Sequence, residues 1–86
     1  MHELSLANEI CRIAEANAGP AGPAAVRQVA VEVGDQSGVE PESLTFCLEV
    51  LLSQPPFGSA TPRLIRQPGD VLRVSYLEVD DGRPDD

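Results

Sequence analysis

The sequence has very few aromatic residues, because Phe46, Phe57 and Tyr76 make up the whole aromatic share of 3%. Apolar residues nevertheless account for 42% of the 86 residues, so the core must be built from leucine, isoleucine, valine and alanine. A chain of this length has room for one domain with a thin core. We therefore expect a single domain over residues 1–80, followed by a charged, flexible tail at 81–86.

Long apolar runs and basic stripes are also missing. No stretch approaches the length that spans a membrane, and no basic segment followed by an apolar one opens the chain. Six basic residues stand against 14 acidic ones, which gives a formal net charge of −8. Because this charge repels phosphate groups and anionic lipids, we expect no nucleic-acid or membrane partner. The composition favours a cytoplasmic protein that binds a metal cation or a basic patch on another protein.

The usual marks of an enzyme are absent from the sequence. There is no nucleophile–base pair, no glycine-rich phosphate loop and no histidine other than His2, so we expect a protein that is not an enzyme. The two cysteines, Cys11 and Cys47, lie within apolar helical patterns and are interpreted as buried small hydrophobic residues. The sequence leaves a disulfide between them open, although a cytoplasmic setting argues against it.

Two segments have the apolar period of an amphipathic helix. The first is Leu4–Ala18, after which glycine and proline stop the helix. The second begins at Pro41, a residue suited to the first helical position, and runs to about Leu52. Their apolar stripes are Leu6, Ile10, Ile13 and Ala14 in the first helix, and Leu44, Leu48, Leu51 and Leu52 in the second.

Three segments are expected to be strands. Val26–Gly34 and Val71–Val79 alternate apolar and polar residues, and Thr61–Arg66 is a shorter candidate in which Pro62 suggests an edge position. The order is therefore helix, strand, helix, strand, strand. We predict an α+β fold in which two amphipathic helices pack on one face of a small mixed β-sheet of about three strands.

Three stretches of the chain are informative together: MHELSLA at residues 1–7, VEVGDQSGVEPESLTF at residues 31–46 and GDVLRV from Gly69. They resemble the HypA/HybF family of hydrogenase nickel-incorporation proteins. The opening Met1–Ala7 (MHELSLA) is typical of that family, and Val31–Phe46 (VEVGDQSGVEPESLTF) is similar to its strand, turn and second helix. The run that starts at Gly69 (GDVLRV) resembles its final strand. The resemblance covers residues 1–54 and, more loosely, residues 69–80.

One departure from the family pattern concerns zinc. Members of the family carry a zinc-binding lobe with two CxxC pairs before the last strand, whereas this chain has no CxxC and only Ser53–Pro68 in that interval. A closed structural zinc site needs four nitrogen or sulfur ligands, which Cys11, Cys47 and His2 do not provide. We therefore expect a short variant without the zinc lobe and without structural zinc.

A nickel site is expected at the amino terminus. The α-amine of Met1, the backbone nitrogen of His2 and the His2 imidazole lie in one short chelating segment, and nickel(II) favours such nitrogen donors in a square-planar arrangement. The resemblance implies that Met1, His2 and Glu3 bind the metal, with Glu3 giving a backbone donor or a carboxylate that orients His2. Asp35, in the turn after the first strand, is a weaker candidate for a group that supports the ligands from nearby.

The resemblance implies a nickel metallochaperone for the maturation of [NiFe]-hydrogenase, working with the hydrogenase large subunit and a HypB-type GTPase. An alternative is an adaptor that keeps the HypA-like fold and docks on the hydrogenase or on maturation proteins without transferring metal. Because only a short connection precedes the last strands, a homodimer formed by strand exchange also stays open. The sequence does not indicate which hydrogenase is served.

Overall fold

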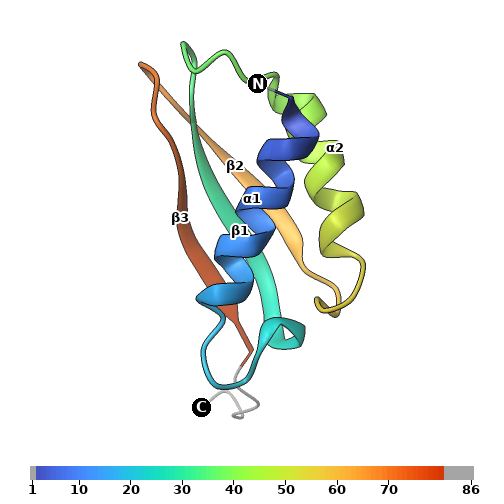
Figure 1. Ribbon diagram of the computed structural model, residues 1–86. Helices are drawn as coiled ribbons and strands as arrows, with labels where there is room; N and C mark the ends of the chain where they lie inside the picture. The colour runs from blue at the N-terminus through green and yellow to red at the C-terminus, as the bar shows by residue number, and fades with distance from the viewer. Residues whose placement is uncertain (1, 81–86) are drawn as a thin grey trace.

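The computed structural model describes residues 2–80, which form two helices and one sheet in the predicted order (Figure 1). A short 3-10 turn at Pro23–Ala25 precedes the first strand. The predicted tail at 81–86 lies outside the described residues. The main elements are α1 (Glu3–Ala16), β1 (Val26–Gly34), α2 (Pro41–Leu52), β2 (Thr61–Gln67) and β3 (Leu72–Val79).

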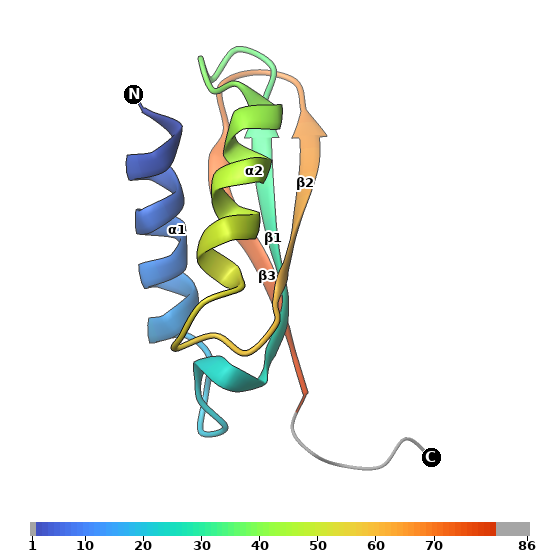
Figure 2. The same ribbon diagram turned by 90° about the vertical axis from the view of Figure 1, so that its right-hand side faces the viewer.

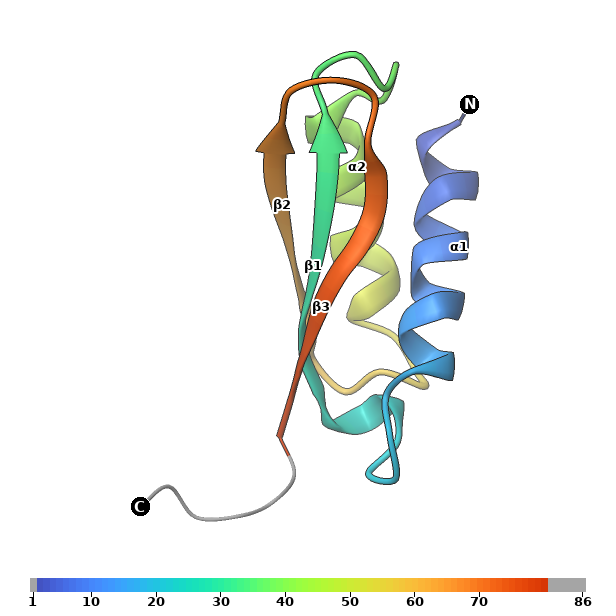
Figure 3. The ribbon, with the colours of Figure 1, turned by 90° about the vertical axis from the view of Figure 1, so that its left-hand side faces the viewer.

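The three strands form a mixed sheet with the spatial order β2-β1-β3. β1 pairs in parallel with β2 and antiparallel with β3, so β1 is central and both later strands are edges. This confirms the α+β prediction and the edge position inferred from Pro62. Both helices lie on the same face of the sheet, and no helix within residues 2–80 covers the opposite face (Figures 2 and 3).

The connection from β2 to β3 passes over the carboxyl end of β1, because these two strands are consecutive in sequence but flank β1 (Figure 3). The backbone N–H groups of Gly34, Asp35 and Gln36 donate to carbonyls of the crossing segment over 2.6–2.8 Å. A Cβ at Gly34 would lie 2.3 Å from the carbonyl oxygen of Gly69. Glycine is therefore required at the end of β1 for the crossing to pack so closely.

β3 does not keep the simple alternation that its sequence suggests. Its pairing with β1 passes from Ala30↔Tyr76 to Val31↔Val74, so Ser75 is an extra residue in the ladder. The bulge shifts the alternation by one residue. As a result, Leu72 and Val74 before it and Leu77 and Val79 after it all face the core.

The core lies between the sheet and the helices and consists of aliphatic residues, as the composition predicts. The central strand contributes Val29, Val31 and Val33, none of which has accessible surface, and Phe57 from the loop after α2 closes one end. α2 buries three of the four residues in its predicted stripe, with Leu51 half-buried. The completely buried residues of α2 are Leu44, Leu48 and Leu52.

α1 ends two residues earlier than predicted, at Ala16. Asn17 caps the helix: its backbone N–H donates to the carbonyls of Ile13 and Ala14, and its side-chain amide donates to Ile13 at 2.8 Å. The side chain and the backbone N–H of Asn17 thus share the carbonyl of Ile13 at the end of the helix. Ala18, predicted as the last helical residue, is instead buried in the core after the cap.

Candidate metal centre

His2 is the residue that precedes the first turn of α1. Its backbone is extended (φ −77°, ψ 132°), and its carbonyl accepts the N–H of Leu6 at 3.1 Å. The imidazole makes no capping hydrogen bond to the helix, and the residue is exposed. The His2 ring is therefore held at a defined point of the backbone while its nitrogen atoms remain open to water.

Glu3 joins the start of α1 to the start of α2. Its Oε2 atom accepts the backbone N–H of Glu40 at 3.2 Å, and Glu40 in turn caps α2 by accepting the N–H of Glu42 at 3.2 Å. The hydrogen bond from the Glu40 N–H, and then that from its own N–H, lower the pKa of Glu3 below its ordinary value. Figure 1 shows the two helix starts side by side at the same end of the molecule.

Asp35 lies in the turn after β1, at the crossing of the chain. Its Oδ1 atom accepts the Nη2–H of Arg66 at 2.8 Å and the Nε–H of the same side chain at 3.2 Å. The contacts of Asp35 are therefore with β2, and the structure gives it none with His2 or Glu3 among residues 2–80. Its role beside a metal stays a prediction.

The predicted ligands come from one contiguous segment rather than from a cluster of side chains. Met1 lies outside the described residues, while His2 and Glu3 are adjacent at the exposed start of α1. Within residues 2–80, the structure gathers no group of three or more His, Cys, Asp or Glu side chains that could hold a metal ion. The nickel site expected from Met1, His2 and Glu3 therefore stays a prediction.

The two cysteines are free thiols, one on each helix. Both Cys11 and Cys47 pack against the core but are only half-buried, so the prediction of full burial was too strong. Burial raises the pKa of the Cys11 thiol, and the nearby Glu15 carboxylate raises it further. A neutral thiol in this position behaves as a small apolar side chain.

Sequence reasoning missed the contact between Glu3 and Glu40, which are 37 residues apart. It also missed a hollow beside α2 in which Phe46 is 66% exposed. A signal for the second feature was present, because Phe46 lies two residues from Leu44 and therefore about 200° around the helix from the buried stripe.

The chain is similar to known proteins over most of its length. The family model for "Hydrogenase/urease nickel incorporation, metallochaperone, hypA" matches residues 1–72. The chain belongs to the HypA family. The predicted membership of the HypA/HybF family is thereby confirmed.

Relatives in the HypA family are longer than this chain. The chain is 46% identical over 52 residues to the hydrogenase maturation factor HypA of Azoarcus sp. (strain BH72), which covers 60% of the chain and 46% of the relative. It is 35% identical over 69 residues to that of Dechloromonas aromatica, covering 80% of the chain and 61% of the relative. For Albidiferax ferrireducens the identity is 35% over 78 residues, with coverage of 91% and 69%. The chain thus spans between about half and two thirds of the length of these relatives.

A short loop at residues 53–60 follows α2, and β2 after it is an edge strand of the sheet. Within residues 2–80, no helix is long and apolar enough to cross a membrane.

Proposed function

We propose that this protein is a nickel metallochaperone for [NiFe]-hydrogenase maturation and that it carries the ion at Met1, His2 and Glu3. The observation that carries the proposal is the match to the nickel-incorporation family over residues 1–72, together with an exposed His2 at the start of α1. Nickel is the cargo in this account. The protein itself performs no catalytic step, and structural zinc has no part in it.

The backbone at the amino terminus suits a chelating segment. The His2 backbone is extended, and its imidazole is not engaged in capping the helix. The amine of Met1, the backbone nitrogen of His2 and the imidazole close small rings around one ion, which keeps the entropy cost of binding low.

The contacts of Glu3 favour one of the two roles considered for it. Its carboxylate is occupied by the backbone N–H of Glu40, so it is poorly placed to orient the His2 ring as well. Its backbone N–H lies in the first turn of α1 and bonds to its own carboxylate rather than to a helix carbonyl. We assign the Glu3 side chain to positioning the segment, and its backbone stays the donor proposed for the metal.

The incomplete set of ligands supports transfer rather than storage. His2 is the only histidine in the chain, so a remaining coordination position must be filled by water, a carboxylate or a group from a partner. The net charge of −8 attracts a divalent cation and suits basic partner surfaces. On this account the partners are the large subunit of the hydrogenase and a HypB-type GTPase in the cytoplasm.

The proposal is tested by titrating nickel into protein with a native, untagged amino terminus and into the His2→Ala variant. We expect tight binding of one ion by the native protein and a loss of at least tenfold in affinity in the variant, because the imidazole donor is removed. Glu15→Ala, which removes an exposed carboxylate elsewhere on α1, serves as the matched control and should bind nickel like the native protein. Equal, weak binding by the native protein and His2→Ala would contradict the proposal and favour the adaptor function.

A further inference from the structure

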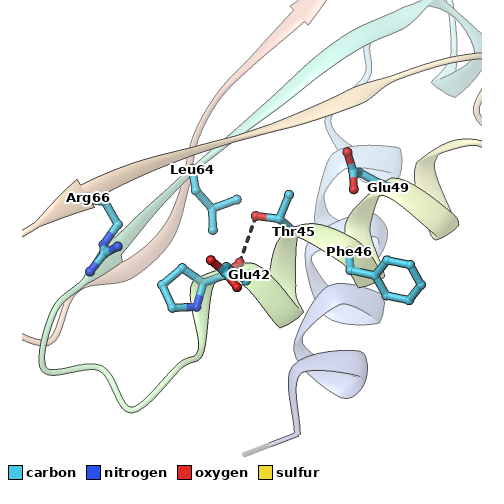
Figure 4. Close-up of a pocket in the computed structure, with 7 residues that line it drawn as sticks. Glu42, Thr45, Phe46, Glu49, Leu64 and Arg66 are labelled. Atoms are coloured by element: carbon cyan, nitrogen blue, oxygen red, sulfur yellow. Dashed lines mark hydrogen bonds between the residues drawn. The ribbon is translucent and has the colours of Figure 1, made fainter.

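A hollow of about 350 Å³ lies between the first two turns of α2 and the edge strand β2 (Figure 4). Leu64 points from β2 towards Thr45 on the helix, and Phe46 and Glu49 extend from the following turns (Figure 4). The Thr45 hydroxyl is already satisfied by the carbonyl of Pro41 at 2.8 Å. The centre of the hollow is therefore apolar. Its lining residues are Pro41, Glu42, Thr45, Phe46, Glu49, Leu64 and Arg66.

The hollow opens along an unpaired edge of the sheet. Within residues 2–80, β2 pairs only with β1, so its outer side carries backbone N–H and C=O groups that can bond to another strand. Figure 2 shows β2 as the outermost strand with α2 lying alongside it. An added strand at this edge would place every second side chain over the hollow.

An exposed aromatic side chain of α2 lines the hollow. Phe46 is 66% exposed and Val50, one turn later, is 40% exposed, whereas the residues of the buried stripe have no accessible surface. A phenylalanine this exposed contributes little to the core of the protein. It is, however, the kind of aromatic side chain that supplies contact area in an interface.

Among residues 2–80, the unpaired charges around the hollow are two carboxylates at a defined spacing. Glu42 and Glu49 are both exposed and flank Phe46 on α2. They are seven residues apart, which separates them by about 10.5 Å along the helix axis. The one cation in the lining, Arg66, is already paired with Asp35. The hollow therefore presents two acidic groups on either side of an apolar centre.

We propose that this surface binds an extended segment of a partner protein in which an apolar residue is flanked, two positions before and two positions after, by basic residues. The segment adds to the outer edge of β2, its apolar side chain enters the hollow beneath Phe46, and its two basic side chains meet Glu42 and Glu49. In a strand, residues four positions apart are separated by about 13 Å. Long, flexible basic side chains bridge the difference between this span and the spacing of the two carboxylates.

A second copy of this chain does not fit the surface. No two of its six basic residues are four positions apart, so the basic–x–apolar–x–basic pattern does not occur in the sequence. Two molecules that each carry a net charge of −8 would also bring acidic groups together at this edge. The occupant is therefore a different, basic protein.

The probe for the test is a fluorescent peptide with an arginine–threonine–isoleucine–threonine–arginine centre set in alternating threonine and valine. We expect saturable binding to the native protein in the absence of nickel, followed by fluorescence anisotropy. The double variant Glu42→Gln with Glu49→Gln should bind about tenfold more weakly at low salt, because two charge pairs are lost. Phe46→Ser should weaken binding by a similar factor through loss of apolar contact, and its unchanged circular dichroism spectrum verifies the fold.

Three controls separate strand addition from simple charge attraction. Glu15→Gln with Glu78→Gln changes the net charge by the same amount at exposed sites outside the hollow and should bind like the native protein. A peptide of the same composition with its isoleucine moved next to an arginine should bind at least tenfold more weakly. A peptide that is N-methylated at alternate residues, on the edge that faces β2, should also bind at least tenfold more weakly.

Several results would overturn the proposal. Binding that is equally sensitive to both glutamate pairs, or that survives N-methylation, would show non-specific attraction rather than strand addition. A native protein that sediments as a dimer, and becomes a monomer with Phe46→Ser, would show that a second copy covers the surface. Nickel titration of the Phe46→Ser variant keeps this test separate from the proposed function, since His2 lies outside the hollow.

Discussion

α1 and α2 lie on the same face of the sheet but are held there by different contacts. α2 places Leu44, Leu48 and Leu52 against the sheet with no accessible surface, whereas the buried residues of α1 are Ala7, Ile10 and Ala14. α1 packs mainly on α2 and touches the sheet chiefly through β3. The helix that begins with the proposed nickel segment is thus the lightly anchored one, and the Glu3–Glu40 hydrogen bond joins its start to α2.

The largest expected effect comes from shortening a buried side chain of α2. Leu48→Ala should lower the free energy of unfolding by about 2–5 kcal/mol, because it leaves a cavity between α2 and the sheet. Ile10→Ala on α1 should lower the free energy of unfolding by less than Leu48→Ala does, because α1 can move to fill the space that the shortened side chain leaves. Urea unfolding of both variants measures the difference, with the exposed Leu4→Ala as a control that should change stability by about 0.5 kcal/mol at most. Equal losses of stability in Leu48→Ala and Ile10→Ala would contradict the conclusion that α1 is held less firmly than α2.

A smaller effect is expected at the chain crossing, which belongs to the sheet rather than to either helix. Gly34→Ala would place a Cβ 2.3 Å from the Gly69 carbonyl oxygen, so the backbone has to shift. We expect a loss of about 1–3 kcal/mol, the usual range for overpacking a close contact. Gln36→Ala, an exposed position in the same turn, is the matched control. Stability of Gly34→Ala equal to that of the control would show that the crossing can relax freely.

The smallest effect concerns the bond between the helix starts and depends on pH. The pKa of Glu3 is lowered in the folded protein, so its ionised carboxylate stabilises the fold above its ordinary pKa of 4.5, and this contribution is lost as the pH falls through the folded value. Glu3→Gln should therefore unfold at a slightly lower temperature than the native protein at pH 7, with the difference shrinking as the pH falls below 4.5 and through the lowered pKa of Glu3. Glu15→Gln, at another exposed position of α1, should show no such convergence. A constant difference across pH 3–7 would argue against the Glu3–Glu40 hydrogen bond.

Much of the fold could be predicted from local patterns, because helix and strand periods are visible within a few residues. The strand Val26–Gly34 and the helix Pro41–Leu52 have the same bounds in the structure as in the prediction. The bulge at Ser75 was hidden, since it depends on how β3 pairs with β1 and not on the sequence of β3 alone. The position of α1's end was missed for a local reason, the capping side chain of Asn17.

The candidate site was only partly accessible from sequence. The segment Met1–Glu3 is identified by its resemblance to a family, and the structure adds the exposure of His2 and the second role of Glu3. The contacts of Glu3 and Asp35 link positions 37 and 31 residues away along the chain. No periodicity or spacing within the sequence carries such information, because these contacts follow from how the helices and strands pack.

The central claim is that the contiguous start of the chain binds nickel through nitrogen donors, and visible absorption spectroscopy of the nickel-loaded protein tests it most directly. Protein with its native amino terminus should give the ligand-field band of square-planar nickel(II), because amine, backbone and imidazole nitrogens surround the ion. Acetylating the amine of Met1 removes one nitrogen donor without moving His2 and should abolish that band. An identical spectrum for the native and acetylated proteins would contradict the claim.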